Sequence, residues 1–236
     1  MNSYGASPFS NIPPVVKNLL IINIIFFIAT SLFVQFPLVE WLGVYYYDSP
    51  KFKVWQVITY MFMHGGFAHI FFNMFALFSF GSLLENTMGS KRFLNFYLIT
   101  GLGALALQFA VQSIEVYSLV GSVNIDPINY QSDNPEHLRT LGQIYYGPMV
   151  GASGAIFGLL IAFGMLFPNM ELFLMFIPVP IKAKFIIPVY ILVELFLGVK
   201  QFEGDSIAHF AHLGGALFGF ILVKLWHLQR PRNYYE

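Results

Sequence analysis

The chain has 236 residues, of which 57% are hydrophobic and only 10% are charged. A soluble domain carries about 25% charged residues, so this composition excludes a water-soluble globular protein and predicts an integral membrane protein. The net charge is zero without any basic run, which excludes nucleic-acid binding, and the absence of cysteine excludes disulfides, thiolate metal sites and cysteine nucleophiles. Residues 1–15 are polar and contain proline, so we expect them to form a mobile cytoplasmic N-terminus.

Apolar segments then predict an all-α membrane protein, a six-transmembrane helical bundle. The expected spans are residues 16–34, 67–84, 93–111, 149–167, 185–198 and 207–226. They form one domain over residues 16–228, followed by a short cytoplasmic tail at 229–236. Residues 171–181 are apolar but interrupted by Pro178 and Pro180, so we expect an interfacial loop there rather than a seventh span.

The distribution of Lys and Arg predicts that both termini lie in the cytoplasm. The first outer loop, residues 35–55, is rich in Trp and Tyr, which favour the membrane interface, so we expect it to be embedded in the outer leaflet. The second outer loop, about 112–148, is polar and contains Asn-Pro and Asp-Pro turns.

Ser153 is a candidate nucleophile, because it lies near the start of an apolar span between Gly151 and Gly154. Glycine permits a sharp turn and close approach, and the N–H groups at a helix N-terminus stabilise negative charge. The alternative is an N-cap serine with packing glycines.

His212 is the candidate base, because it lies at a similar depth near the start of the last span. Gly215 and Gly219 follow it at the small-residue spacing that Gly154 and Gly158 repeat on span four, which predicts close packing of the two spans. No acidic residue lies within the membrane near His212 in sequence, so we expect a Ser–His dyad. Phe157, one turn below Ser153, is expected to press against the imidazole. The alternative is a core histidine bonded to a backbone carbonyl.

His69 and Asn73 are four residues apart and share one helix face at the same depth. Both side chains can donate hydrogen bonds, and with the Ser153 N–H they are candidate donors to an oxyanion. The alternative is a structural role as polar contacts between helices.

The remaining polar residues of the spans carry weaker signals. His64 lies in a Gly-rich turn, and His64, His69 and His209 can in principle ligate a metal, but the motif His-Glu-x-x-His is absent and we expect no metal site. Glu85 is expected to bond the next loop or to be a solvated end charge. Glu194 lies inside span five, where a carboxylate is costly, and receives no assigned role.

The chain resembles the rhomboid family of intramembrane serine proteases. The resemblance rests on His69-x-x-x-Asn73, Gly151-x-Ser153-Gly154 and Ala211-His212-x-x-Gly215-x-x-x-Gly219, and on Leu84-Glu85 followed by Gly89, Lys91-Arg92 and Phe93. The sequence departs from the family pattern at two places. Phe157 stands where the family often has Tyr. Trp55-Gln56 stands where Trp-Arg is typical, and the loss of Arg removes a possible hydrogen-bonding partner in the loop.

The resemblance implies a Ser153–His212 dyad, an oxyanion site of His69, Asn73 and the Ser153 amide, and structural support from His64. It implies no cofactor, and substrates that are single-pass transmembrane proteins cut near the outer end of their helix. We expect a bacterial cytoplasmic membrane with the site open to the outer face; the sequence gives no signal for an oligomeric state.

Two other function classes are compatible with parts of the sequence. An inactive rhomboid-like scaffold would bind transmembrane clients, but such members usually lack the Ser or the His. A transporter or channel could use a polar path through His69, Asn73, His209 and Glu194, but neither inverted repeats nor broken half-helices are evident.

Overall fold

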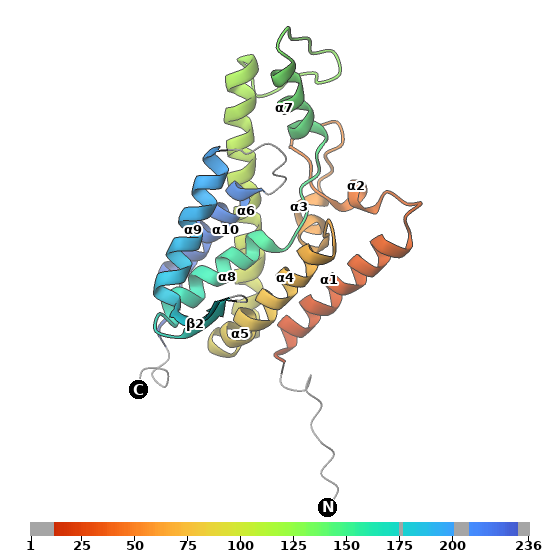
Figure 1. The fold of residues 1–236 in the computed structure, drawn as a ribbon. Helices are drawn as coiled ribbons and strands as arrows, with labels where there is room; N and C mark the ends of the chain where they lie inside the picture. The colour runs from red at the N-terminus through yellow and green to blue at the C-terminus, as the bar shows by residue number, and fades with distance from the viewer. Residues whose placement is uncertain (1–11, 175–176, 201–207, 231–236) are drawn as a thin grey trace, which may run out of the picture.

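The computed structural model describes residues 12–174, 177–200 and 208–230, and this part of the chain is mostly helical (Figure 1). Its elements, in order, are α1 (Pro14–Leu32), α2 (Leu38–Leu42), α3 (Gln56–Thr59), η2 (Tyr60–Phe62), α4 (Phe67–Ala76), η3 (Leu77–Gly81), α5 (Ser82–Met88), α6 (Ser90–Val120), α7 (Pro135–Tyr146), α8 (Ser153–Leu166), β1 (Glu171–Leu174), β2 (Ile177–Lys182), α9 (Ala183–Lys200) and α10 (His209–Leu225).

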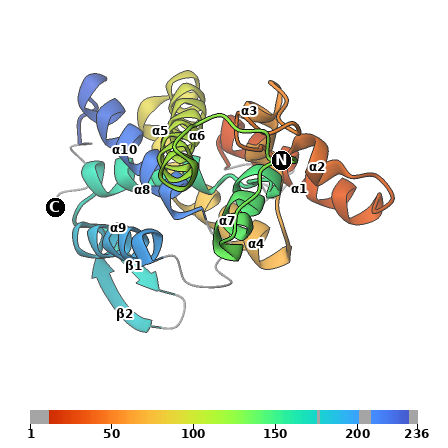
Figure 2. The same ribbon diagram turned by 90° about the horizontal axis from the view of Figure 1, so that it is seen from above.

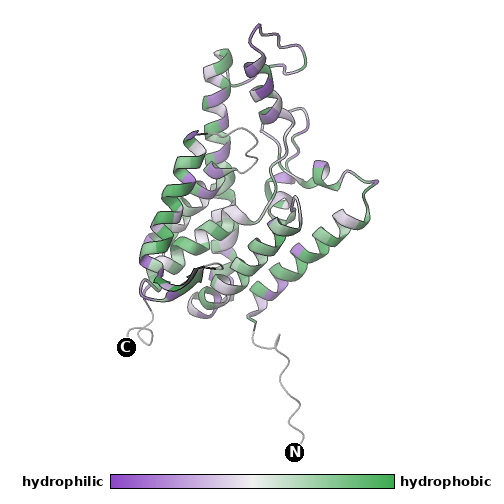
Figure 3. Ribbon diagram, viewed as in Figure 1, coloured by the Kyte–Doolittle hydropathy of each residue, from purple (hydrophilic) through white to green (hydrophobic). Residues whose placement is uncertain are grey.

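Three helical segments are long and apolar enough to cross a bilayer, namely Pro14–Leu32, Phe67–Met88 and Ser90–Val120. Figure 3 shows hydrophobic residues over most of the bundle. Large apolar side chains such as Ile25, Phe75 and Phe196 are more than half exposed on its outside. So much outward-facing apolar surface matches a lipid environment, and the chain is a membrane protein.

The interior of the bundle is built around α8. Ten of its 14 residues are buried, which explains why the helix can be shorter than a lipid-facing span. It packs against α6 and α10, which also pack on each other. Helices α4 and α9 lie on either side of α8 (Figure 1).

The predicted interfacial loop over residues 171–181 is wrong in its local structure. Strands β1 and β2 form an antiparallel pair, with Glu171 opposite Lys182 and Leu172 opposite Ile181, beside α9 (Figure 2). Proline is compatible with an edge strand where its nitrogen faces away from the neighbouring strand. Pro178 and Pro180 occupy alternate positions of β2, so their nitrogens face the same side of the strand, and the prolines that exclude a helix do not exclude a strand.

The polar loop predicted over residues 112–148 is shorter than expected, because α6 continues to Val120 and α7 begins at Pro135. The Asn134 side chain caps α7 by accepting the Glu136 N–H at 3.0 Å. The Tyr145 hydroxyl donates to Asp48 at 2.8 Å, so α7 holds the first outer loop in place.

Gln56, which stands where the family typically has Arg, still supplies a hydrogen-bonding side chain at this position. The side chain is buried, and its carbonyl oxygen accepts the Lys53 N–H at 2.9 Å. The neighbouring Trp55 indole donates to the Trp41 carbonyl at 3.0 Å. A neutral amide therefore makes a hydrogen bond within the loop without placing a charge in the interior.

Glu85 joins the start of α1 to the turn between α5 and α6, and it is not a solvated end charge. Its side chain is only 2% exposed. Its carboxylate accepts the Val15 and Val16 N–H groups at 3.0 and 2.8 Å and the Ser90 hydroxyl at 2.6 Å. The first N–H groups of a helix have no intrahelical acceptor, and a negative charge there is favourable, so Glu85 completes α1.

Replacing Glu85 with alanine should therefore detach the start of α1. Hydrogen bonds to a charged group contribute about 1.5–3 kcal/mol each, and we expect the free energy of unfolding to fall by about 3 kcal/mol. Unfolding in detergent micelles measures this. Glu136→Ala is the control, because the Glu136 side chain forms an exposed pair with Arg139, and exposed pairs contribute little to stability. Equal stability of the two variants would contradict the assigned role.

Candidate active site

Ser153 lies at the point where an extended segment turns into α8. The Gly151 N–H donates to the Tyr60 carbonyl at 2.9 Å, and Gly151 has φ 128°, a conformation that side-chain-bearing residues rarely adopt. Ser153 is the first residue of α8. Its N–H consequently has no acceptor within the helix and is available to a ligand.

His212, on the first turn of α10, reaches Ser153 directly. Its Nε2 lies 2.8 Å from the Ser153 Oγ, a hydrogen-bond distance. The Phe157 ring stacks on the imidazole, with centroids 4.3 Å apart and planes inclined by 8°. Both contacts were predicted from the sequence. The stacked Phe157 ring limits rotation of the imidazole.

Close packing of α8 on α10, predicted from the small-residue spacing, permits this short distance. A Cβ added at Gly215 would lie 1.8 Å from the Gly154 carbonyl oxygen, and one at Gly219 would lie 2.7 Å from the Gly158 Cα. Backbone therefore meets backbone along both helices. Larger residues would force the helices apart and lengthen the contact between Ser153 and His212.

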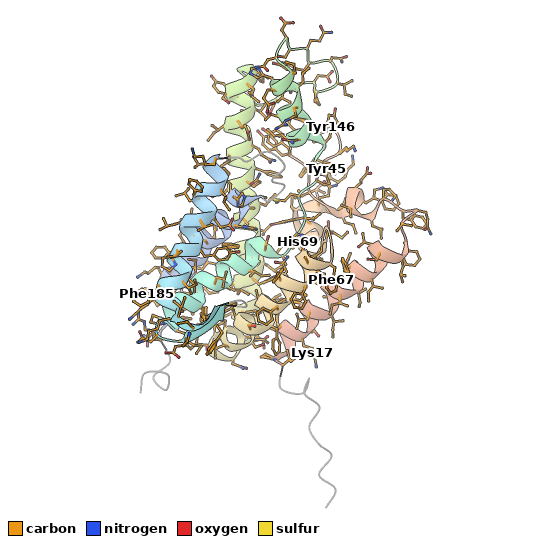
Figure 4. The ribbon with its side chains drawn as sticks, in the orientation of Figure 1. Lys17, Tyr45, Phe67, His69, Tyr146 and Phe185 are labelled. Atoms are coloured by element: carbon orange, nitrogen blue, oxygen red, sulfur yellow. The ribbon has the colours of Figure 1, made fainter. Side chains whose placement is uncertain are left out.

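His69 and Asn73 approach the same point from α4. The Nδ1 of His69 accepts the Gly65 N–H at 3.4 Å, which leaves the proton on Nε2. A Cβ added at Gly151 would lie 2.8 Å from that Nε2 and 3.6 Å from the Ser153 Oγ, so the donor and the hydroxyl flank Gly151. Figure 4 shows His69 near the beginning of α8.

Asn73 adds a second donor on this side. The residue is buried, and its amide Nδ2 has no hydrogen-bond partner among the described residues. A buried donor without a partner is costly unless a ligand completes it. The amide is therefore suited to bind a carbonyl oxygen of a substrate.

His64 lies behind His69 and does not contact Ser153 in any described interaction. Its ring meets the His69 ring edge-on, with centroids 5.1 Å apart. Burial, and then the neighbouring His69, lowers the pKa of His64 to about 4, so the ring is neutral at physiological pH. A neutral ring packed against His69 supports its orientation.

The sequence reasoning missed a third group at the pair. Glu194 of α9 places Oε2 2.8 Å from the His212 Nδ1 and 2.7 Å from the His209 Nδ1. The carboxylate is 5% exposed. The available signal was the position of a carboxylate inside an apolar span, where ionisable groups are usually functional. The proposed dyad therefore has an acidic partner, supplied by the preceding helix.

The donor atoms of Glu194, His209 and His212 lie within 4.8 Å of one another, close enough to hold a metal ion. This differs from the set considered from sequence, because His64 and His69 do not take part. Both Nδ1 atoms already face one carboxylate oxygen.

Comparisons with known proteins give the family to which the chain is related. Residues 51–229 match the Rhomboid domain family. An uncharacterised mitochondrial rhomboid protein of Schizosaccharomyces pombe is 28% identical over 202 residues, and YdcA of Bacillus subtilis, named as a candidate rhomboid protease, is 29% identical over 180. The human mitochondrial presenilin-associated rhomboid-like protein is 29% identical over 204 residues.

These alignments cover 73%, 76% and 78% of this chain and 51%, 71% and 45% of the three relatives. The chain thus spans about half the length of the mitochondrial relatives that it matches. Because mitochondrial proteins are prominent among them, the comparisons do not support the expected bacterial cytoplasmic membrane. The family match runs from the first outer loop to the end of α10 and includes both Ser153 and His212, and the chain therefore belongs to the rhomboid family.

Proposed function

We propose that the chain is an intramembrane serine endopeptidase that cleaves single-pass transmembrane proteins near the outer end of their helix. The 2.8 Å contact between Ser153 Oγ and His212 Nε2 carries the proposal. A serine is a weak nucleophile unless a base accepts its proton, and a neutral imidazole at hydrogen-bond distance provides that base. A scaffold that only binds clients would not require the contact.

In the proposed reaction, Ser153 attacks the scissile carbonyl while His212 takes the hydroxyl proton. The Ser153 N–H, the His69 Nε2–H and the Asn73 amide stabilise the oxyanion. His212 then gives its proton to the leaving amine, and water releases the acyl group with His212 again acting as the base. The reaction consumes one water molecule and returns Ser153 and His212 to their starting states.

The substrate class follows from the position of the pair within an apolar bundle. A helical carbonyl is already hydrogen-bonded, so a substrate helix must unwind locally before it can react. We expect small residues at the cut and helix-weakening residues beyond it. In the orientation expected from the basic residues, the pair lies near the outer face, where water can reach it.

Cleavage in liposomes tests the proposal. Purified protein is reconstituted with a single-pass model substrate, and mass spectrometry locates the cut. We expect cleavage within the outer part of the substrate helix by the wild-type chain, and none by Ser153→Ala. Equal cleavage by both would refute Ser153 as the nucleophile and with it the proposal, and a folded wild-type chain without activity on a panel of such substrates would favour the scaffold.

A further inference from the structure

We infer that Glu194 is the positioning residue of a Ser153–His212–Glu194 triad, fixing the protonation of His212 rather than merely joining α9 to α10. The inference rests on the proposed protease function and deepens it. Its basis is a chain of contacts across three helices, from Ser153 on α8 through His212 on α10 to Glu194 on α9, with both links 2.8 Å long.

The direction of the hydrogen bonds follows from the chemistry of the groups. A carboxylate can only accept, so the His212 Nδ1 facing it must carry the ring proton. The neutral imidazole then has a lone pair on Nε2, which faces the Ser153 hydroxyl. This is the tautomer that can take a proton from serine; the other tautomer would present an N–H to the hydroxyl and could not act as a base.

The carboxylate itself is held in position from a second side. The Nδ1 of His209 lies 2.7 Å from the same Oε2 that faces His212, and Glu194 and His209 are both about 95% buried. His209 and His212 are three residues apart on α10, so both face α9. A second donor restricts the position of the carboxylate and helps offset its removal from water.

The carboxylate also acts when His212 becomes charged. As Ser153 attacks, the serine proton moves to His212 Nε2, and the resulting imidazolium keeps its Nδ1 proton. Glu194 receives no proton; it stabilises the cation through the existing hydrogen bond. The proton balance of the reaction is therefore unchanged by the third residue, and its effect is on rate.

Glu194→Gln tests this role with nearly the same side-chain volume. Glutamine removes the negative charge that stabilises the imidazolium, and where its amide nitrogen faces His212 it donates and favours the unproductive tautomer. We expect kcat in liposomes to fall by about 10²- to 10⁴-fold with KM within about twofold of wild type, as expected for loss of oriented acid–base catalysis. An unchanged kcat, or an effect on KM alone, would overturn the inference.

Glu85→Gln is the matched control, because Glu85 is also a buried glutamate that accepts two backbone N–H groups, but it does not contact His212. We expect this variant to lose stability while kcat stays within about threefold of wild type. An equal loss of kcat in the two variants would make Glu194 a structural residue. Activity that a chelator abolishes and zinc restores would instead assign Glu194, His209 and His212 to a metal.

Nitrogen NMR of ¹⁵N-histidine-labelled protein separates this inference from the proposed function, because it needs no substrate. We expect the His212 signal to show a protonated, hydrogen-bonded Nδ1 in wild type and a changed tautomer in Glu194→Gln. If wild type fails to cleave but the tautomer changes, the protease proposal fails and the positioning role stands. If wild type cleaves, and both the tautomer and kcat are the same in Glu194→Gln, only the role of Glu194 fails.

Discussion

Replacing His212 with alanine is expected to lower kcat for substrate cleavage by about 10⁴- to 10⁶-fold, because Ser153 then has no base. Among the described residues, the His212 imidazole makes the side-chain hydrogen bond to the Ser153 Oγ. The Phe157 ring covers one face of this imidazole. The oxyanion donors would remain in place and account for the residual rate. Cleavage kinetics in liposomes, with folding checked by size-exclusion chromatography, measure the loss.

His209→Ala is the matched control for this prediction. His209 is a buried histidine on the same helix and contacts the same carboxylate oxygen, but it does not reach Ser153. Loss of one hydrogen bond from Glu194 should cost about tenfold at most. Comparable losses in the two variants would mean that the histidine pair acts as a structural unit and that His212 has no special chemical role.

Replacing Gly215 with valine is expected to prevent native packing of α8 on α10. Even its first side-chain carbon would lie 1.8 Å from the Gly154 carbonyl oxygen and 2.7 Å from its carbonyl carbon, and backbone atoms cannot rotate away as a side chain can. Overpacking typically costs about 1–3 kcal/mol, and a collision with backbone should cost at least about 3 kcal/mol. We expect little folded protein, measured by thermal unfolding and chromatography in detergent.

Gly142→Ala is the comparison for that effect. Gly142 lies inside α7, and an added Cβ would meet no atom within 4 Å. Alanine favours a helix interior over glycine by about 0.5–1 kcal/mol, so this variant should be as stable as wild type or slightly more stable. If Gly215→Val unfolded at the same temperature as Gly142→Ala, the close approach of α8 and α10 would be refuted.

The meeting of Ser153, His212, His69 and Asn73 could be expected from the sequence, because each of them lies near the start of an apolar segment. The glycines of α8 and α10 indicate which two helices can approach closely. Membership of the rhomboid family, the membrane setting and the close contact of α8 with α10 follow from these signals.

The partnership of Glu194 with His212 was not predictable in the same way. It depends on the rotation of α9 about its own axis, and the apolar residues around the helix do not define that angle, since lipid and protein interior are both apolar. The expectation of a dyad was therefore incomplete. The extension of α6 and the pairing of β1 with β2 were missed for a related reason, because each is set by tertiary packing.

The contact between Glu194 and His212 joins chemistry to the lipid-facing side of the molecule. Helix α9 presents Val189, Leu192 and Phe196 outward, each more than half exposed. A hydrogen bond weakens once its donor–acceptor distance exceeds about 3.2 Å, whereas helix tilt responds gradually to the hydrophobic thickness of the bilayer. Lipids of unmatched acyl length should therefore lengthen this hydrogen bond and lower the rate of the proposed cleavage while every helix remains folded.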